Sequence, residues 1–208
     1  MVQVQQFVNE LMTSNCFVVG DNETHHCVII DPGSEKAERE MQFINNNHLV
    51  LDYIILTHEH TDHTWGVNAL IEKYETKVVC STECKNLLPL AGNYYFQFYY
   101  DDSNYTYTVK RVDITTESIS NRLLWNGLEV SFIPTPGHST GSICILMGNR
   151  FFSGDTLMQY KLRINKKSGS KEQLKDTINN LLSILPLDIT VYPGHGTPFM
   201  LSEYKMIL

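Results

Sequence analysis

Short apolar runs that end in turn residues dominate the N-terminal part of the chain, a pattern typical of strands. Val2, Val4 and Val8 alternate with polar residues, as expected for a strand with one face buried. Two further strands are predicted at 16–19 and 28–30, and they are followed by turns at 20–22 and 32–33. Together these strands predict a sheet at the N-terminus.

The next stretch, 34–46, has the periodicity of an amphipathic helix. Ala37, Met41 and Ile44 fall on one face, and Ser34 has the chemistry of an N-cap. Beyond this helix the same reasoning predicts three more elements: a buried strand at 53–56, a helix at 65–74 and a strand at 77–80.

The C-terminal half repeats the alternation of strands and helices. Its predicted strands are apolar and short: 128–133, 142–147, 150–152 and 189–192. Ser170 and Gln173 have the spacing of a capping box and open a helix to about Leu185. Alternating elements in both halves predict an α/β layered fold. Because no linker or low-complexity tract interrupts the chain, residues 1–208 are predicted to form one domain.

The middle of the chain is tyrosine-rich. The segment from Tyr94 to Tyr107 holds many of the 11 tyrosines beside Asp101, Asp102 and Asn104. It is compatible with a hairpin or with a loop that covers a cleft. We interpret it as a surface insertion that packs through its rings.

Five of the eight histidines lie in loops directly after predicted strands. These loops also contain aspartates and are rich in Gly, Pro, Thr and Ser. Loops at one end of a rigid sheet are where folds place reactive groups. The candidate ligands in these loops are His58, His60, Asp62, His63, His138, Asp155 and His195.

Imidazole and carboxylate are the ligands that zinc and similar ions take. Seven such groups are more than one ion needs, and a carboxylate has two oxygens that can bridge two ions. The pattern therefore predicts two divalent metal ions, Zn²⁺ in the first place, with Fe or Mn as alternatives.

The remaining histidines and the cysteines have plainer interpretations. We assign His25, His26 and His48 to structural or exposed positions. The five cysteines are an odd number without a Cys-x-x-Cys pair, which does not suggest a disulfide framework. Cys80 and Cys84 are interpreted as a strand end and the beginning of a short helix rather than as a metal pair.

These motifs resemble those of the metallo-β-lactamase fold superfamily of metal-dependent hydrolases. The shared stretches are His58-x-His60-x-Asp62-His63, Gly137-His138, Gly154-Asp155 and Gly194-His195. The sequences around the last three are most similar to the glyoxalase II-like branch, which hydrolyses thioesters such as hydroxyacylglutathione. The resemblance implies a four-layer αβ/βα sandwich, the metallo-β-lactamase fold, with the site at the sheet edges.

The resemblance also implies a role for each ligand. The first metal would be held by His58, His60 and His138. The second would be held by Asp62, His63 and His195, and Asp155 would bridge the two. Asp31 matches an aspartate that supports the site in the family, although it also fits a plain turn residue before Pro32-Gly33.

This arrangement predicts a hydrolase in which a metal-bound hydroxide attacks a thioester or ester, with Asp62 and Asp155 in the catalytic centre. Other activities of the same fold remain open. A persulfide dioxygenase would use one iron, and a lactonase or β-lactamase would share the fold, although many β-lactamases have Cys where Asp155 stands. A nuclease and a non-catalytic metal-binding protein are further alternatives.

The net charge of −7 disfavours nucleic acid and anionic membranes as partners. A small-molecule substrate is expected, and the basic residues Lys161, Arg163, Lys166 and Lys167 attract an anionic one or form a solvated loop. Glyoxalase II grips glutathione with a C-terminal helical domain that we do not expect here, because the chain ends soon after His195. The N-terminus does not resemble a signal peptide, so we expect a cytoplasmic protein.

Overall fold

The computed structural model describes residues 2–10, 12–91, 94–160, 164 and 168–206. Its first sheet has six strands in sequence order. These are β1 (Val2–Val8), β2 (Asn15–Asp21), β3 (His26–Ile30), β4 (Val50–Ile55), β5 (Lys77–Cys80) and β6 (Ile114–Thr115). β1, β2 and β3 pair antiparallel, whereas β3 to β6 pair parallel. The parallel strands therefore end at one edge of the sheet, where the loop after β4 begins.

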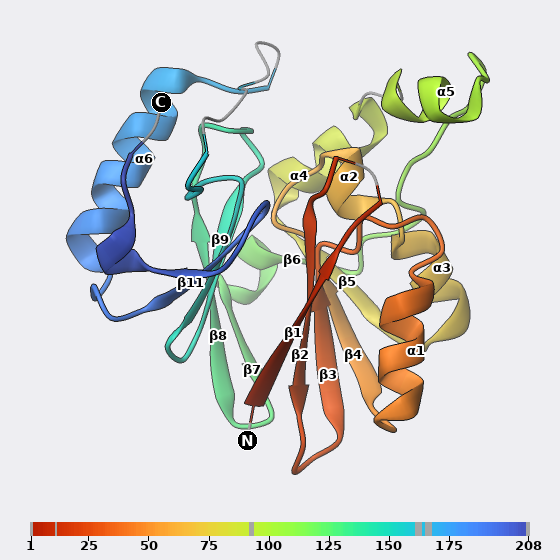
Figure 1. The fold of residues 1–208 in the computed structure, drawn as a ribbon, viewed down its shortest axis with the longest axis horizontal. Coiled ribbons are helices and arrows are strands. Elements are labelled where there is room, and N and C mark those ends of the chain that lie inside the picture. Colours follow the sequence, from red (N-terminus) through yellow and green to blue (C-terminus); the bar gives the residue numbers. More distant parts are fainter. Residues whose placement is uncertain (1, 11, 92–93, 161–163, 165–167, 207–208) are drawn as a thin grey trace.

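The second sheet also has six strands, in the order β12-β11-β10-β9-β8-β7. These are β7 (Arg122–Trp125), β8 (Leu128–Pro134), β9 (Ile143–Met147), β10 (Arg150–Gly154), β11 (Thr190–Pro193) and β12 (Phe199–Met200). Only β10 and β11 pair parallel, and the loops after both strands carry candidate ligands. The two sheets lie face to face, and their ligand-bearing loops meet at the upper end in Figure 1.

Helices cover the outer faces of both sheets (Figure 1). On the first sheet these are α1 (Glu38–Asn46), α3 (Val67–Lys73) and α4 (Thr82–Leu87), whereas the short α2 (Thr61–Thr64) lies at the upper end of this sheet. α6 (Lys171–Ile184) covers the second sheet, and α5 (Tyr94–Tyr100) lies above α2. The order helix, sheet, sheet, helix is the predicted αβ/βα sandwich.

Alternation along each strand divides the core into layers. In β3, Cys27 and Ile29 pack with α1 and α3, whereas Val28 and Ile30 face the second sheet. Between the sheets, Phe17 packs on Phe152 with their ring centroids 5.5 Å apart. A third cluster packs α6 on the outer face of the second sheet through its buried residues Leu174, Ile178 and Leu181. Strands such as β3, β9 and β10 are thus buried on both faces, so their apolar runs are nearly continuous, whereas β1 and β8 alternate.

The prediction for the first helix was wrong at its beginning. α1 begins at Glu38 rather than near Ser34, and Ala37 before it has a left-handed backbone with φ of 45°. The Ser34 hydroxyl donates to Asn9 and accepts from the Glu10 N–H, so it serves the β1–β2 connection instead of a helix N-terminus. Because its hydroxyl is bonded to Asn9 and Glu10, Ser34 does not cap the helix.

Two other predictions are corrected in part. The helix predicted at 65–74 is shorter, because α3 runs only from Val67 to Lys73, and a separate short helix, α2, precedes it within the ligand motif. The tyrosine-rich segment is neither a hairpin nor a plain loop, because its first part is the helix α5. The segment does pack through its rings, since Phe96 lies 4.4 Å from Trp65 between ring centroids. Two predictions are confirmed. Ser170 is the N-cap of α6, and Cys80 ends a strand while Cys84 lies in the first turn of a short helix.

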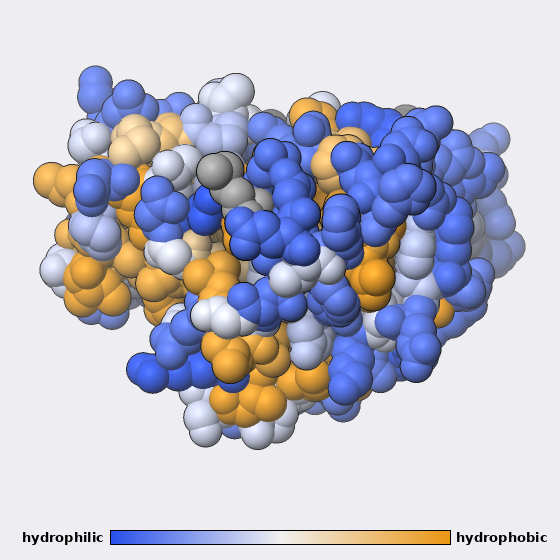
Figure 2. Space-filling model, turned by 90° about the horizontal axis from the view of Figure 1, so that it is seen from below, coloured by the Kyte–Doolittle hydropathy of each residue, from blue (hydrophilic) through white to orange (hydrophobic). Residues whose placement is uncertain are grey.

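The end opposite to the ligand-bearing loops has a mixed surface. Figure 2 shows this face, with hydrophobic residues beside broad hydrophilic areas. Two exposed apolar side chains lie at the end of α6, Ile184 as its last residue and Leu187 just after it. Across the described residues, no helix combines the length and the apolar character needed to cross a membrane.

Candidate metal centre

The strand ends position all seven candidate ligands. His58 and His60 follow β4, and Asp62 and His63 lie in α2 directly behind them. His138, Asp155 and His195 follow β8, β10 and β11 of the second sheet. The loops of the two sheets face each other across the upper end of the sandwich (Figure 1). The fold therefore brings together residues that are far apart in sequence.

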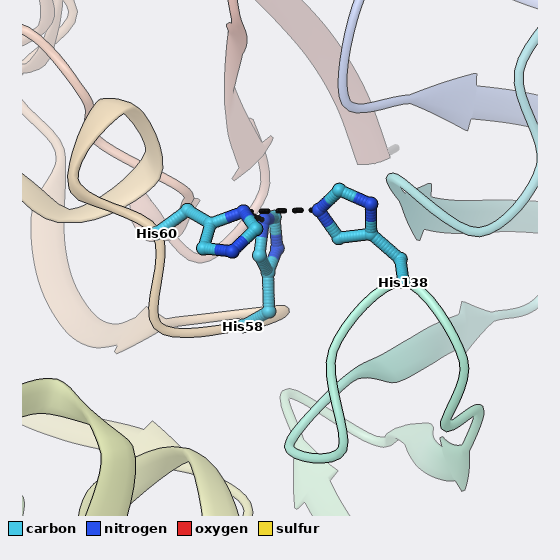
Figure 3. A group of neighbouring side chains, drawn as sticks. All are labelled: His58, His60 and His138. Atoms are coloured by element: carbon cyan, nitrogen blue, oxygen red, sulfur yellow. Dashed lines mark hydrogen bonds between the residues drawn. The ribbon is translucent and has the colours of Figure 1, made fainter. Parts of the chain in front are cut away.

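The first group consists of His58, His60 and His138, whose ligand atoms all lie within 4.8 Å of one another. Nδ1 of His60 is 3.1 Å from Nε2 of His58 and 2.9 Å from Nε2 of His138. Figure 3 shows the His138 ring pointing from its own loop toward the other two rings. Three ring nitrogens thus converge on one point.

The second group consists of Asp62, His63 and His195, again within 4.8 Å. Oδ2 of Asp62 lies 3.5 Å from Nε2 of His63 and 3.6 Å from Nε2 of His195. The His58 and His63 rings are 4.3 Å apart between centroids, so the two groups are adjacent.

Asp155 lies between the groups and faces both. Its Oδ2 is 3.3 Å from Nε2 of His138 and 3.6 Å from Nε2 of His195. Its Oδ1 is 3.6 Å from Nε2 of His63. One carboxylate thereby reaches the nitrogens of both ligand sets, which is the position that a bridging ligand needs.

The donor set fits metal ions better than it fits hydrogen bonds. Nε2 of His63 and Oδ1 of Asp155 are buried without a hydrogen-bond partner, although they are only 3.6 Å apart. Unpaired buried polar atoms are costly and call for an explanation. Ligand atoms around a tetrahedral zinc ion are about 3.3–3.6 Å apart, given metal–ligand distances of ~2.0–2.2 Å. The separations in the second group and around Asp155 lie in this range, whereas those from His60 to His58 and His138 are shorter, at 3.1 and 2.9 Å.

The protonation states of the histidines in the first group also favour metal binding. Burial, with the neighbouring His63 and His60, holds the pKa of His58 well below its usual range. Burial lowers the pKa of His138 to about 4, although Asp155 opposes this shift. Both rings are therefore neutral near pH 7, and a neutral ring offers a lone pair to a metal.

The second group has the opposite electrostatics. Burial opposes charge on His63, but the carboxylates of Asp62, Asp155 and Asp31 raise its pKa to about 10. Burial alone would raise the pKa of Asp155, yet His138 and His63 hold it well below its usual range. Asp155 is therefore a carboxylate at neutral pH and is ready to bind a cation.

Asp31 supports the site from behind. Its Oδ1 accepts the Thr57 N–H at 2.8 Å and its Oδ2 accepts the Thr57 hydroxyl at 2.6 Å. Oδ2 also lies 3.1 Å from Nδ1 of His63. Asp31, His58 and His63 lie within metal-binding reach as well, but both Asp31 oxygens already accept hydrogen bonds. The contact with His63 leaves Nε2 of that ring for the second group.

Sequence reasoning missed two supporting residues. The buried Glu59 accepts the Ser139 hydroxyl at 2.7 Å through Oε1 and at 2.6 Å through Oε2. This pair joins the loop of His58 and His60 to the loop of His138. Glu59 stands within the motif, but no local pattern indicates that Ser139 is its partner.

The other histidines and the thiols stay outside the site. His26 Nδ1 contacts Asp52 at 2.8 Å, and His25 and His48 are exposed, as predicted. All five cysteines are free and buried. The basic residues Lys161, Arg163, Lys166 and Lys167 lie outside the described residues, so their proposed contact with substrate stays a prediction.

Comparison with known proteins places the site in a family. The family model of the Metallo-beta-lactamase superfamily matches residues 10–195. The zinc-dependent hydrolase PksB of Bacillus subtilis, described as a probable hydrolase of polyketide biosynthesis, is 26% identical over 193 residues, with 88% of this chain and 73% of the relative covered. A hydroxyacylglutathione hydrolase of Psychromonas ingrahamii is 26% identical over 180 residues, covering 86% of this chain and 60% of the relative.

Solved structures show the same fold. The crystal structure of the BLEG-1 B3 metallo-beta-lactamase superposes with a TM-score of 0.81 at 24% identity, covering 97% of this chain and 95% of the other. The match of the family model spans every candidate ligand from His58 to His195. The chain therefore belongs to the metallo-beta-lactamase superfamily of metal-dependent hydrolases.

Proposed function

We infer that the protein is a two-metal hydrolase that cleaves a thioester or ester. The position of Asp155 carries this proposal, because its two oxygens face His63 on one side and His138 with His195 on the other. Two divalent ions bound there would supply an activated water and a Lewis acid for the substrate carbonyl. Zn²⁺ suits this mixture of imidazole and carboxylate.

The residues of the chain supply the geometry and the charge for this chemistry. His58, His60 and His138 would hold one ion, Asp62, His63 and His195 would hold the other, and Asp155 would serve both. Asp31 fixes the orientation of His63 through Nδ1. Thr57 links Asp31 to the first group, because its hydroxyl lies 3.0 Å from Nδ1 of His58.

A cysteine nucleophile is a poor alternative. Burial raises the pKa of Cys16 well above its usual range and the pKa values of Cys27 and Cys144 to about 12. A thiol that stays protonated and buried does not attack a carbonyl at neutral pH. Attack by water is therefore the mechanism that the site supports.

The preference for a thioester rests on similarity. The relative from Psychromonas ingrahamii is named a hydroxyacylglutathione hydrolase, and the loops around His138, Asp155 and His195 resemble that branch. This chain spans 60% of the length of that relative, so glutathione itself is not part of the proposal.

The test is metal analysis followed by a substrate panel. We expect two metal ions per chain and hydrolysis of a thioester or ester that stops on chelation and returns with Zn²⁺. The panel also contains a lactone, a β-lactam, a phosphodiester and a persulfide. One iron per chain with oxygen uptake on the persulfide would identify a dioxygenase instead. If only the lactone or the β-lactam is hydrolysed, the protein is a lactonase or a β-lactamase instead.

A further inference from the structure

The turn between β1 and β2 contacts the loops that carry the second ligand group. Residues 9–14 connect the two strands, and the Asn9 N–H donates to the Ser14 carbonyl at 2.7 Å. Ser14 also forms an isolated antiparallel bridge with His195. The turn thus lies against a ligand that is far along the chain.

Asn15 binds the backbone on both sides of His195. It is only 1% exposed, at the beginning of β2. Its backbone and side-chain N–H groups donate to three carbonyls: Gly194 at 2.6 Å, Pro193 at 2.9 Å and Gly196 at 2.8 Å. Gln6 donates to Oδ1 of Asn15 at 2.8 Å and so fixes the orientation of the amide.

Ser14 and Asn9 hold the other ligands of the same group. The Ser14 hydroxyl donates to the Asp62 carbonyl at 2.5 Å, and Nδ2 of Asn9 lies 3.4 Å from the same oxygen. Nδ2 of Asn9 also donates to the Asp31 carbonyl at 3.3 Å, and Asp31 contacts His63. Every ligand of the second group is therefore connected to this turn.

The first group has a different support. Among the described residues, the hydrogen bonds of residues 9–15 reach neither His58 and His60 nor the loop of His138. The two loops of that group are joined by the Glu59–Ser139 pair. The direct hydrogen bonds of the turn therefore reach the second group, and the first group is connected to it only through Asp31 and Thr57.

We propose that Asn9, Ser14 and Asn15 are positioning residues for the second metal ion. The role rests on the two-ion function proposed above. A ligand set must be held within about 0.5 Å of its productive geometry. Loss of a residue that orients a ligand typically weakens metal binding by about 10- to 100-fold. Because the turn contacts one group only, its loss should affect one ion only.

The test titrates apo-protein with Zn²⁺ against a chromophoric chelator. The full-length wild type is compared with the variants Asn15→Ala and Ser14→Ala, of which Ser14→Ala removes fewer hydrogen bonds. A third variant, His195→Ala, removes a ligand of the second group. Its zinc affinity is therefore that of the ion bound by the first group alone. Asn68→Ala is the matched control, because Asn68 also bonds backbone groups, those of Thr108 and Lys110, but none of a ligand loop. Circular dichroism of each apo-protein reports whether the variant folds.

We expect Asn15→Ala and Ser14→Ala to weaken the second ion by about 10- to 100-fold while the first ion binds as in His195→Ala. Asn68→Ala should bind both ions like the wild type. Equal weakening of both ions in folded Ser14→Ala, or no weakening in either variant, would overturn the positioning role alone. A wild type that binds a single ion would overturn the two-ion function itself.

Discussion

Oδ2 of Asp31 lies 3.1 Å from Nδ1 of His63, and this contact turns Nε2 of His63 toward Asp62 and Asp155. Asp31 itself has a left-handed backbone with φ of 54°, directly after β3. The predicted supporting role of Asp31 therefore has a geometric basis: the carboxylate selects which ring nitrogen faces the ligand group.

Replacement of Asp31 by Asn should weaken metal binding at the second group by about 10- to 100-fold. The amide has the same shape but offers a donor where His63 needs an acceptor. Zinc titration measures the effect. Asp52→Asn is the control, because Asp52 holds Nδ1 of His26 in the same manner at 2.8 Å, away from the site. Equal metal affinities in the two variants would contradict the prediction.

Replacement of Asp155 by Asn or Ala should reduce hydrolysis to the uncatalysed background and reduce metal content below two ions per chain. Asn has lost the negative charge that a bridging ligand brings, and Ala has lost both oxygens. Metal analysis and a thioester assay measure the result. Asp188→Asn, at an exposed loop position, should behave like the wild type. Full activity in a metal-free Asp155→Ala would refute the mechanism.

Gly194→Ala should disturb the metal site because the added methyl group has no room. A Cβ atom at this position would overlap Oδ1 of Asp155 and would lie 3.0 Å from Cε1 of His63. Overpacking of this kind costs about 1–3 kcal/mol of stability. We expect a lower melting temperature together with reduced zinc content.

Gly20→Ala is the matched control for this substitution, because its Cβ atom would meet only Leu49 at an ordinary 3.4 Å. Thermal unfolding and metal analysis of both variants distinguish the cases. Normal zinc content in Gly194→Ala would show that the loop tolerates a methyl group beside Asp155.

Glu40 should make the stability of the protein depend on pH. Its side chain is buried in α1, its Oε2 has no hydrogen-bond partner, and burial raises its pKa above the ordinary value of 4.5. The folded state therefore favours the protonated acid. Its stabilising contribution is complete below about pH 4.5 and is lost as the pH rises through the folded-state pKa.

Glu40→Gln removes this titration, so the variant should match the wild type near pH 4 and be more stable at pH 8. Each unit of pKa shift corresponds to about 1.4 kcal/mol, which is about 3–6 °C in melting temperature for a chain of this size. Urea unfolding at both pH values measures the difference. Glu38→Gln, exposed on the same helix, should show no such divergence. If the stability advantage of Glu40→Gln over the wild type became smaller between pH 4 and pH 8, the pKa of Glu40 would not be raised and the prediction would be wrong.

Local patterns were sufficient for most elements and for the ligand motif. Strands such as β3 and β4 are buried on both faces, so their apolar runs are visible in the sequence. The helix α6 begins at the predicted cap, because the Ser170 side chain accepts the Gln173 N–H. The spacing of His58, His60, Asp62 and His63 is itself a local feature, since one loop and one short helix carry all four.

Predictions failed where distant contacts compete with local preference. Ser34 has the chemistry of a helix cap, yet its hydroxyl bonds Asn9, and α1 begins four residues later at Glu38. The two-residue strands β6 and β12 were not predicted, because two residues carry too little periodicity. β7 was not predicted either, because only Trp125 of its four residues is buried. The helix α5 was missed because aromatic residues have only moderate helix propensity.

The chain by itself determined which side chains are available as ligands, because residue type and spacing after each strand are written in the sequence. Only the folded molecule decided how those ligands are grouped and held. The separation of Asp155 from His63 and His138, and the hold of Asn15 on the loop of His195, depend on the packing of one sheet against the other. Contacts between residues so far apart in sequence have no local signature, since they form only when both sheets are in place.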